Sequence, residues 1–168
     1  MVVDVDEYRE YVAGRMDGWR RTAYLLCGDW HAADDLVSIA LVKLYRHWGK
    51  VSTVEHPDAY VRQILVRTML NERRRSWRRE HPVTTVPDRA ATAGGPESVA
   101  DRQMFVALLG ELPPRRRAVL VLRYFCDLSV EETAAQLGCS TGTVKSQTAR
   151  ALDSLRMRLG GAVVAEEV

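Results

Sequence analysis

Polar side chains that can read DNA bases and bind phosphates cluster between residues 140 and 150 of this chain. They carry hydroxyl, amide or cationic groups, and they are Ser140, Thr141, Thr143, Lys145, Ser146, Gln147 and Arg150. Side chains of these types form hydrogen bonds with base edges in the major groove and with backbone phosphates. The pattern predicts an exposed helix face that recognises duplex DNA without any covalent step.

The residues just before this face have the pattern of a helix-turn-helix that would position it. Ser129 and Glu132 have the spacing of a capping box. Gly138 stands at a turn that favours positive φ, and Ser140 can cap the second helix. A stripe expected to face the core follows at helical spacing: Val144, Thr148, Ala151, Leu155 and Leu159. The alternative is an ordinary helical hairpin whose exposed face is merely polar.

Residue groups that would support catalysis or hold a metal are missing from the sequence. Asp34 and Asp35 are adjacent, so on a helix they point in different directions and make a poor metal pair. The four histidines show no ligand spacing, and no Gly-rich phosphate loop is present. We therefore expect a binding protein rather than an enzyme, with no metal, no cofactor and no small-molecule substrate.

Composition places the chain among one- or two-domain globular proteins. It has 168 residues, of which 46% are hydrophobic and 27% charged, with a net charge of only +2. Cys27, Cys126 and Cys139 lie far apart, which argues against a disulfide framework and favours reduced thiols. No signal peptide and no apolar run of membrane-spanning length is found. We expect a cytoplasmic protein with no direct membrane insertion.

Charge and apolar patterning divide the chain into two helical lobes. Residues 81–96 (HPVTTVPDRAATAGGP) have no periodic stripe and several Pro and Gly, which is typical of a flexible linker. No segment alternates as a strand would. The expected fold is all-α, with two small helical domains at 1–80 and 97–160, the linker at 81–96, and a frayed tail at 161–168.

The first lobe should contain three helical segments. Residues 5–27 form one helix or a bent pair, ended by Gly28. A second helix covers 32–48, with Asp34 and Asp35 in its first turn, and Gly49 ends it. Pro57 begins a third helix over 57–78. The core stripe of that third helix is Val61, Ile64, Leu65, Thr68 and Met69. In the second lobe, one helix ends near residues 112–114 and Pro114 begins the next.

The ordered set of motifs resembles the bacterial σ70 family, and within it the extracytoplasmic-function (ECF) sigma factors. The matching segments are AADDLVSIALVKLY, PDAYVRQILVRTMLNERRRSWRR and LPPRRRAVLVLRYFCDLSVEETAAQLGCSTGTVKSQTARALDSLR. The resemblance covers residues 8–159 and implies a σ2-like domain, a linker and a σ4-like helix-turn-helix domain. It implies a protein that binds core RNA polymerase and directs promoter-specific initiation.

The resemblance also implies which residues meet the polymerase. The first matching helix would dock on the clamp coiled coil of the β′ subunit through Asp34, Asp35, Leu36, Val37 and Ala40. Leu36 and Val37 could instead serve the internal core. Ser38 and Ile39 stand where the family often has Gln and Glu. Arg115 to Arg117 could touch phosphate or the flap of the β subunit, or could be a solvated charge run.

Promoter DNA would be contacted at two places if the resemblance holds. The −10 element would meet Arg62, Arg67, Arg73, Arg74 and Trp77, with unstacked bases captured near residues 51–56. Asn71 stands where an Asp is common in the family. The −35 element would meet the cluster at 140–150 described above. The family is commonly held inactive by an anti-sigma factor, which is therefore an expected partner.

Two other classes of protein were weighed against this interpretation. A response-regulator-like protein shares the helix-turn-helix but needs an α/β receiver domain, and residues 1–80 show no strands. A metal-dependent nuclease needs clustered carboxylates facing a cleft, which the sequence lacks.

Overall fold

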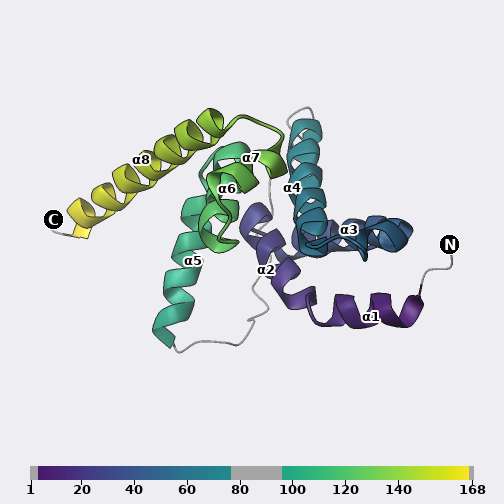
Figure 1. Cartoon of the computed structure of the whole chain (residues 1–168). Helices are drawn as coiled ribbons and strands as arrows, with labels where there is room; N and C mark the ends of the chain where they lie inside the picture. The colour runs from purple at the N-terminus through teal and green to yellow at the C-terminus, as the bar shows by residue number, and fades with distance from the viewer. Residues whose placement is uncertain (1–3, 77–95, 167–168) are drawn as a thin grey trace. The chain divides into compact units, whose positions relative to one another are not determined.

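Helices make up every element of the computed structural model, which describes residues 4–76 and 96–166 (Figure 1). No strand occurs in these two ranges, so the expected all-α class is confirmed. The chain divides into two compact units, residues 1–91 and 92–168. The predicted linker at 81–96 lies outside the described residues, apart from Pro96 at the start of α5.

Four helices lie in the described residues of the first unit, 4–76. They are α1 (Val5–Ala13), α2 (Met16–Cys27), α3 (Trp30–Val51) and α4 (Pro57–Ser76). Of the two forms expected for residues 5–27, one helix or a bent pair, the structure has two helices, α1 and α2, which are separated at Gly14 and Arg15. Gly28 ends α2 in the left-handed conformation with φ of 74°, a conformation that glycine adopts without a Cβ penalty.

Helix α3 is longer at both ends than the sequence pattern predicts. It begins at Trp30 because the Asp29 carboxylate caps it, accepting a hydrogen bond from the Ala32 N–H at 2.9 Å. Asp34 and Asp35 therefore lie in its second turn, and their predicted place in the first turn was wrong. Gly49 does not end the helix either. The chain remains helical to Val51 because Trp48 and Val51 are both buried in the core.

The core of the first unit lies where α2, α3 and α4 pack on one another. Pro57 begins α4 as predicted, and four of the five residues in its predicted stripe are buried, namely Val61, Ile64, Leu65 and Met69. Thr68 is only half-buried, whereas Val66, which the stripe did not include, is fully buried. The described part of α4 ends at Ser76, and its predicted end at Arg78 lies outside the described residues.

Between residues 96 and 166, the second unit has four α-helices and a short π-helical segment. They are α5 (Pro96–Gly110), α6 (Pro114–Leu120), η1 (Val121–Phe125), α7 (Val130–Leu137) and α8 (Thr141–Glu166). The π-helix was not predicted, because its wider turns give no distinct apolar spacing in a five-residue segment. It leaves the aromatic side chains of Tyr124 and Phe125 exposed.

The predicted helix-turn-helix is confirmed in its local details. Ser129 Oγ accepts from the Glu132 N–H at 3.0 Å, and Glu132 Oε2 accepts from the Ser129 N–H at 2.7 Å. Gly138 has φ of 63°, and Ser140 Oγ accepts from the Thr143 N–H at 3.1 Å. These contacts fix the end of α7 and the start of α8.

Packing of the helix-turn-helix centres on one buried cluster from three helices. Val119 of α6, Ala134 of α7 and Val144 of α8 form it. Ala151 is also buried, but Leu159 is 41% exposed, so the last position of the predicted stripe was wrong. Helix α8 continues to Glu166, and the frayed tail at 161–168 stays a prediction.

Replacing Ser129 with Ala should lower the free energy of unfolding by about 1 kcal/mol, the typical value of an N-cap side chain. The hydrogen bond from the Glu132 N–H to Ser129 Oγ is lost, whereas the backbone N–H of residue 129 can still donate to Glu132 Oε2. Urea denaturation of the purified chain measures the change. Ser154→Ala is the matched control, since Ser154 bonds only within α8 to the Arg150 carbonyl. Equal stability of the two variants would contradict the prediction.

Candidate nucleic-acid interface

The first turns of α8 present the predicted DNA-reading face to solvent. Thr141, Lys145, Ser146 and Arg150 are exposed, whereas Thr143 and Gln147 are half-buried. Within the described ranges, neither Lys145 nor Arg150 has a carboxylate at ion-pair distance. Both cations are therefore available to an anionic partner.

Some of the hydroxyl groups on this face already have partners within α8. Ser140 Oγ lies 2.9 Å from Thr143 Oγ1, in addition to capping the helix. Ser146 Oγ donates to the Thr143 carbonyl at 3.1 Å. Ser140, Thr143 and Ser146 thus shape the start of α8, while Lys145, Gln147 and Arg150 are the longer side chains that can extend from it.

A second basic surface joins α3 and α4 in the first unit, and the sequence analysis missed most of it. The Tyr60 hydroxyl of α4 lies 3.2 Å from His47 Nδ1 of α3. His47 shares a helix face with Lys43 and Lys50, which are four residues before and three after it, and all three are exposed. Arg67, also exposed, is seven residues from Tyr60 and lies on the same side of α4. We call Lys43, His47, Lys50, Tyr60 and Arg67 the α3–α4 surface.

Arg62 faces the other way from Arg67, although the sequence analysis grouped the two. The residues are five positions apart, which separates them by more than a third of a turn around α4. The Arg62 side chain is half-buried, and its Nε is buried with no hydrogen-bond partner among the described residues. Burial and the Asp58 carboxylate raise the pKa of Tyr11, and the nearby cations of Arg15 and Arg62 partly oppose this. Arg62 therefore lies near α1.

The remaining residues predicted for the −10 element lie outside the part of the chain that can be described. These are the side chains of Arg73 and Arg74, and the whole of Trp77. Of the other aromatic candidates, Trp48 is buried in the core, as expected, and Tyr60 is half-buried at the α3–α4 surface.

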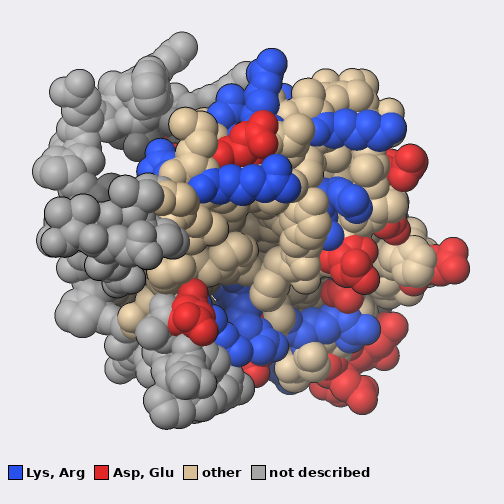
Figure 2. Space-filling view, turned by 90° about the vertical axis from the view of Figure 1, so that its left-hand side faces the viewer, with Lys and Arg blue, Asp and Glu red and all other residues tan. Residues whose placement is uncertain are grey.

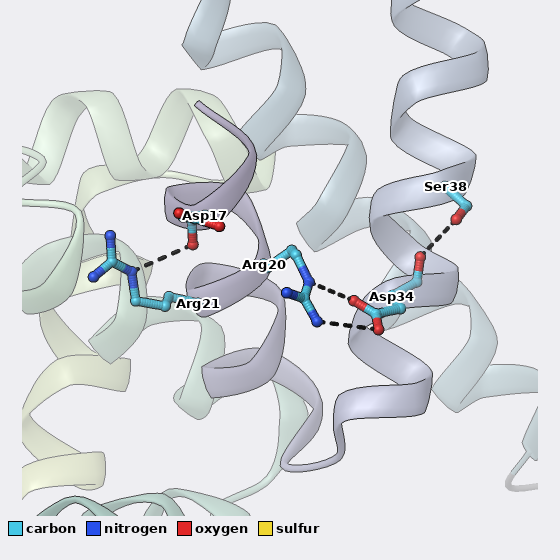
Figure 3. A network of polar contacts seen from close by, with 5 residues as sticks. All are labelled: Asp17, Arg20, Arg21, Asp34 and Ser38. Carbon is cyan, nitrogen blue, oxygen red and sulfur yellow. Dashed lines mark hydrogen bonds and ion pairs between the residues drawn. The ribbon is translucent and has the colours of Figure 1, made fainter. Parts of the chain in front are cut away.

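Three of the five residues predicted to meet the polymerase belong to the core instead. Leu36, Val37 and Ala40 are all at most 4% exposed. Asp34 is exposed but paired, because Arg20 Nε of α2 donates to its Oδ1 at 2.7 Å and Arg20 Nη2 to its Oδ2 at 3.3 Å (Figure 3). The burial of Leu36 and Val37 matches the alternative that both serve the internal core, and a contact of these residues with the polymerase stays a prediction.

The opposite side of α3 carries its own exposed apolar side chains. Val42 is 53% exposed and Ile39 is half-buried. Asp35 lies one turn before Ile39, Ser38 lies one turn before Val42, and both are exposed. These positions follow the i, i+3, i+4, i+7 spacing of one helix face. We call Asp35, Ser38, Ile39 and Val42 the outer stripe of α3. The spacing could have revealed it from sequence, but the buried stripe is more strongly apolar.

Of the arginine run at the start of α6, one member has a structural role. Arg117 is 3% exposed, and its Nη2 donates to the carbonyls of Gly110 at 2.8 Å and Leu112 at 3.3 Å. Its predicted contact with phosphate or polymerase was wrong, because the side chain satisfies carbonyls at the end of α5. Arg115 is exposed and Arg116 half-buried.

Basic side chains do not form one continuous field on the face shown in Figure 2. Lys and Arg lie there in separate groups, with Asp and Glu between them. This distribution fits the small net charge of +2. Any attraction for nucleic acid must therefore come from local groups rather than from the charge of the whole molecule. In the part of the chain that can be described, no helix is long and apolar enough to cross a membrane.

Comparison with known proteins identifies the class to which these two units belong. Residues 16–79 match sigma-70 region 2, and residues 102–155 match sigma-70 region 4. The chain therefore belongs to the sigma-70 family of RNA polymerase sigma factors.

Individual relatives extend this likeness over nearly the whole chain. The RNA polymerase sigma-E factor of Streptomyces avermitilis is 41% identical over 160 residues, covering 93% of this chain and 87% of that protein. The sigma-E factor of Streptomyces coelicolor is 39% identical over 160 residues, covering 93% and 88%. ECF sigma factor SigD of Mycobacterium tuberculosis is 39% identical over 82 residues, covering 46% and 39%.

Two solved structures share the fold. RpoE of Bartonella quintana, in complex with the anti-sigma factor NepR, matches with a TM-score of 0.73 at 23% identity, covering 93% of this chain and 98% of that one. CnrH, in complex with the cytosolic domain of CnrY, matches with a TM-score of 0.61 at 22% identity, covering 92% and 88%.

Proposed function

We propose that this chain binds core RNA polymerase and directs it to promoters by contacting DNA with both of its units. One observation carries the proposal. Each unit has exposed basic side chains on one helix face, within a segment that matches the family. In the second unit these are Lys145 and Arg150, and in the first they belong to the α3–α4 surface. We assign the domains to residues 1–80 and 97–160, with a linker at 81–96.

The start of α8 is proposed to read the −35 element in the major groove. Lys145, Gln147 and Arg150 would make base or phosphate contacts, while Ser140 and Thr143 hold the first turn in place and Thr141 and Ser146 approach the backbone. The supporting evidence is that Lys145 and Arg150 are exposed on the second helix of a helix-turn-helix.

The α3–α4 surface is proposed to hold the −10 element. Lys43, Lys50 and Arg67 would bind phosphates, and the half-buried Tyr60 offers a ring on which an unstacked base can lie. The connection at 52–56, which leads from α3 to α4, remains the proposed place of base capture. Contacts by Arg73, Arg74 and Trp77 stay predictions.

The outer stripe of α3 is proposed to dock on the polymerase clamp. It combines the exposed carboxylate of Asp35 with the apolar side chains of Ile39 and Val42, so that a partner could bury them together. Arg115 and Arg116 remain candidates for the flap of the β subunit.

Regulation by an anti-sigma factor is proposed from the relatives. A solved sigma factor of the same fold, RpoE of Bartonella quintana, was determined in complex with the anti-sigma factor NepR. We also propose that the chain acts in the cytoplasm as a non-catalytic component of the polymerase, as expected for a sigma factor.

Run-off transcription tests the proposal as a whole. Core polymerase is supplied with a library of genomic fragments from the source bacterium, with and without the purified chain. Transcripts that depend on the chain, starting at a shared pair of upstream elements, would support it. If no fragment gives a transcript that depends on the chain, the proposal is overturned.

Replacing Arg150 with Ala should lower promoter occupancy by the holoenzyme about fivefold, because one charge-assisted contact to DNA is lost. Footprinting on a promoter recovered from the library measures the occupancy. Arg156→Ala is the control, since Arg156 lies further along α8 and sits 3.5 Å from the Asp153 carboxylate. Undiminished protection of the −35 region by the Arg150 variant would refute the assignment.

A further inference from the structure

One carboxylate, that of Asp58, accepts hydrogen bonds from three side chains of the preceding helices. The Tyr11 hydroxyl of α1 donates to Asp58 Oδ1 at 3.1 Å, and Trp19 Nε1 of α2 donates to the same oxygen at 3.2 Å. Arg15 Nε, from the residues between α1 and α2, donates to Asp58 Oδ2 at 3.3 Å. The Arg15 guanidinium also lies 4.0 Å from the centre of the Tyr11 ring.

This cluster is a main attachment of α1 to the rest of the first unit. No residue of α1 is fully buried, and the Tyr8 ring packs edge-on against the rings of Tyr45 and Trp48, at 5.1 and 5.5 Å between ring centres. Two tyrosines hold it: Tyr8, whose hydroxyl donates to the Leu41 carbonyl at 3.0 Å, and Tyr11. The Tyr11 ring also contacts the rings of Trp19 and Trp48 at 5.9 and 4.9 Å. Helix α1 lies outside residues 16–79, the range that matches the family.

Asp58 joins the contacts that hold α1 to the beginning of α4, next to the α3–α4 surface. It is the second residue of α4 and follows the connection at 52–56 by only two positions. Tyr60 is two residues further along α4, so the two side chains point to nearly opposite sides of the helix. The cluster therefore holds the back of the first turn of α4, while Tyr60 faces the α3–α4 surface.

The connection itself has few contacts that could fix it. Thr53, Val54, Glu55 and His56 are all exposed. Their contacts within the described residues are local. Thr53 Oγ1 donates to the Lys50 carbonyl, and the Val54 N–H donates to the Val51 carbonyl at 3.2 Å. The His56 carbonyl accepts from the Ala59 N–H at 3.1 Å, and Glu55 Oε1 lies 4.0 Å from His56 Nε2. Its position therefore depends on its two ends. The end at α3 is fixed by the buried Val51, and the end at α4 by the residues that hold Asp58.

We propose that Asp58 is a positioning residue for strand opening, which uses Tyr11, Arg15 and Trp19 to hold the first turn of α4 and the connection at 52–56 in place for an unstacked base. The inference rests on the proposed function of the first unit. It adds that α1, through Tyr11, takes part in promoter opening although it offers no DNA-binding group at this site.

The test compares Asp58→Asn with the unaltered chain in holoenzyme on two templates. One is a duplex promoter recovered from the genomic library, and the other carries the same sequence with a mismatched, already open −10 region. The variant retains Oδ1 but places an amide against Arg15. We expect initiation on the duplex to fall about fivefold relative to the open template, because opening alone needs the positioned connection. Tyr11→Phe, which keeps the ring and removes one donor, should lower the same ratio about twofold.

Asp6→Asn is the matched control, because it removes the same charge from the first unit at an exposed position in α1. Thermal unfolding and polymerase binding are measured on every variant. If Asp58→Asn lowers both templates equally, or has the same duplex-to-open ratio as Asp6→Asn, the positioning role is wrong. If the unaltered chain itself directs no transcription, the proposed function is overturned instead. Failure of the positioning role and failure of the proposed function are therefore distinguishable.

Discussion

Replacing Arg67 with Gln is expected to weaken promoter binding by the holoenzyme about tenfold and to reduce the slope of log K against log salt by about one. The α3–α4 surface places the exposed Arg67 guanidinium on the same side of α4 as Tyr60, and no ion pair is found for it within the described ranges. A cation of this kind binds a phosphate and releases a counterion. Binding titrations over a series of salt concentrations measure both quantities.

Arg62→Gln is the matched control, because Arg62 and Arg67 were both expected to contact the −10 element. Arg62 is half-buried near Tyr11, on another side of α4. We expect its replacement to leave the salt slope unchanged and to alter the stability of the first unit instead. If the two variants change the slope equally, the division of α4 into a DNA side and an α1 side is wrong.

The parts of the fold that the sequence predicted well depend on contacts between near neighbours. The capping box of Ser129 and Glu132, the positive φ of Gly138 and the cap by Ser140 each involve residues at most three apart. Such contacts follow from residue type and spacing alone. The helix-turn-helix was therefore predictable before any tertiary packing was known.

The choice between two apolar faces of α3 could not be made in this way. Leu36, Val37 and Ala40 follow one helical stripe, and Ile39 and Val42 follow another. Which of them is buried depends on how α2 and α4 pack on α3, and these helices bury the first stripe. The same tertiary contacts extend α3 through Gly49, because burial of Trp48 and Val51 outweighs the cost of a glycine within a helix.

Charged residues were the hardest to assign, since runs of arginine look alike in sequence. Arg115, Arg116 and Arg117 differ only in their angle around α6, yet only Arg117 is buried. The basic side chains of α3, such as Lys43 and Lys50, were overlooked because they are spaced along a helix rather than adjacent. A run of three adjacent arginines is easily recognised in a sequence, but a helix presents residues three or four apart on one face.

Arg117→Ala should lower the free energy of unfolding of the second unit by about 3 kcal/mol, which is within the range for loss of a buried hydrogen-bonded charge. The guanidinium satisfies the carbonyls of Gly110 and Leu112 at the end of α5, where a positive charge also suits the helix dipole. Its removal leaves both carbonyls short of a donor and opens a space beneath α6. Helix α5 would then lose its main polar link to α6.

Hydrogen exchange of the amides in α6, α7 and α8 measures this loss for the second unit alone. Tryptophan fluorescence would report the first unit instead, because all four tryptophans precede residue 80. Arg115→Ala, two residues away and exposed, should change stability by no more than about 0.5 kcal/mol. Equal protection of the amides in both variants would show that Arg117 is not structural. If Arg117→Ala reduced promoter binding but left the hydrogen-exchange protection unchanged, Arg117 would be a contact to DNA or polymerase after all. The structural role and the contact role therefore predict opposite results.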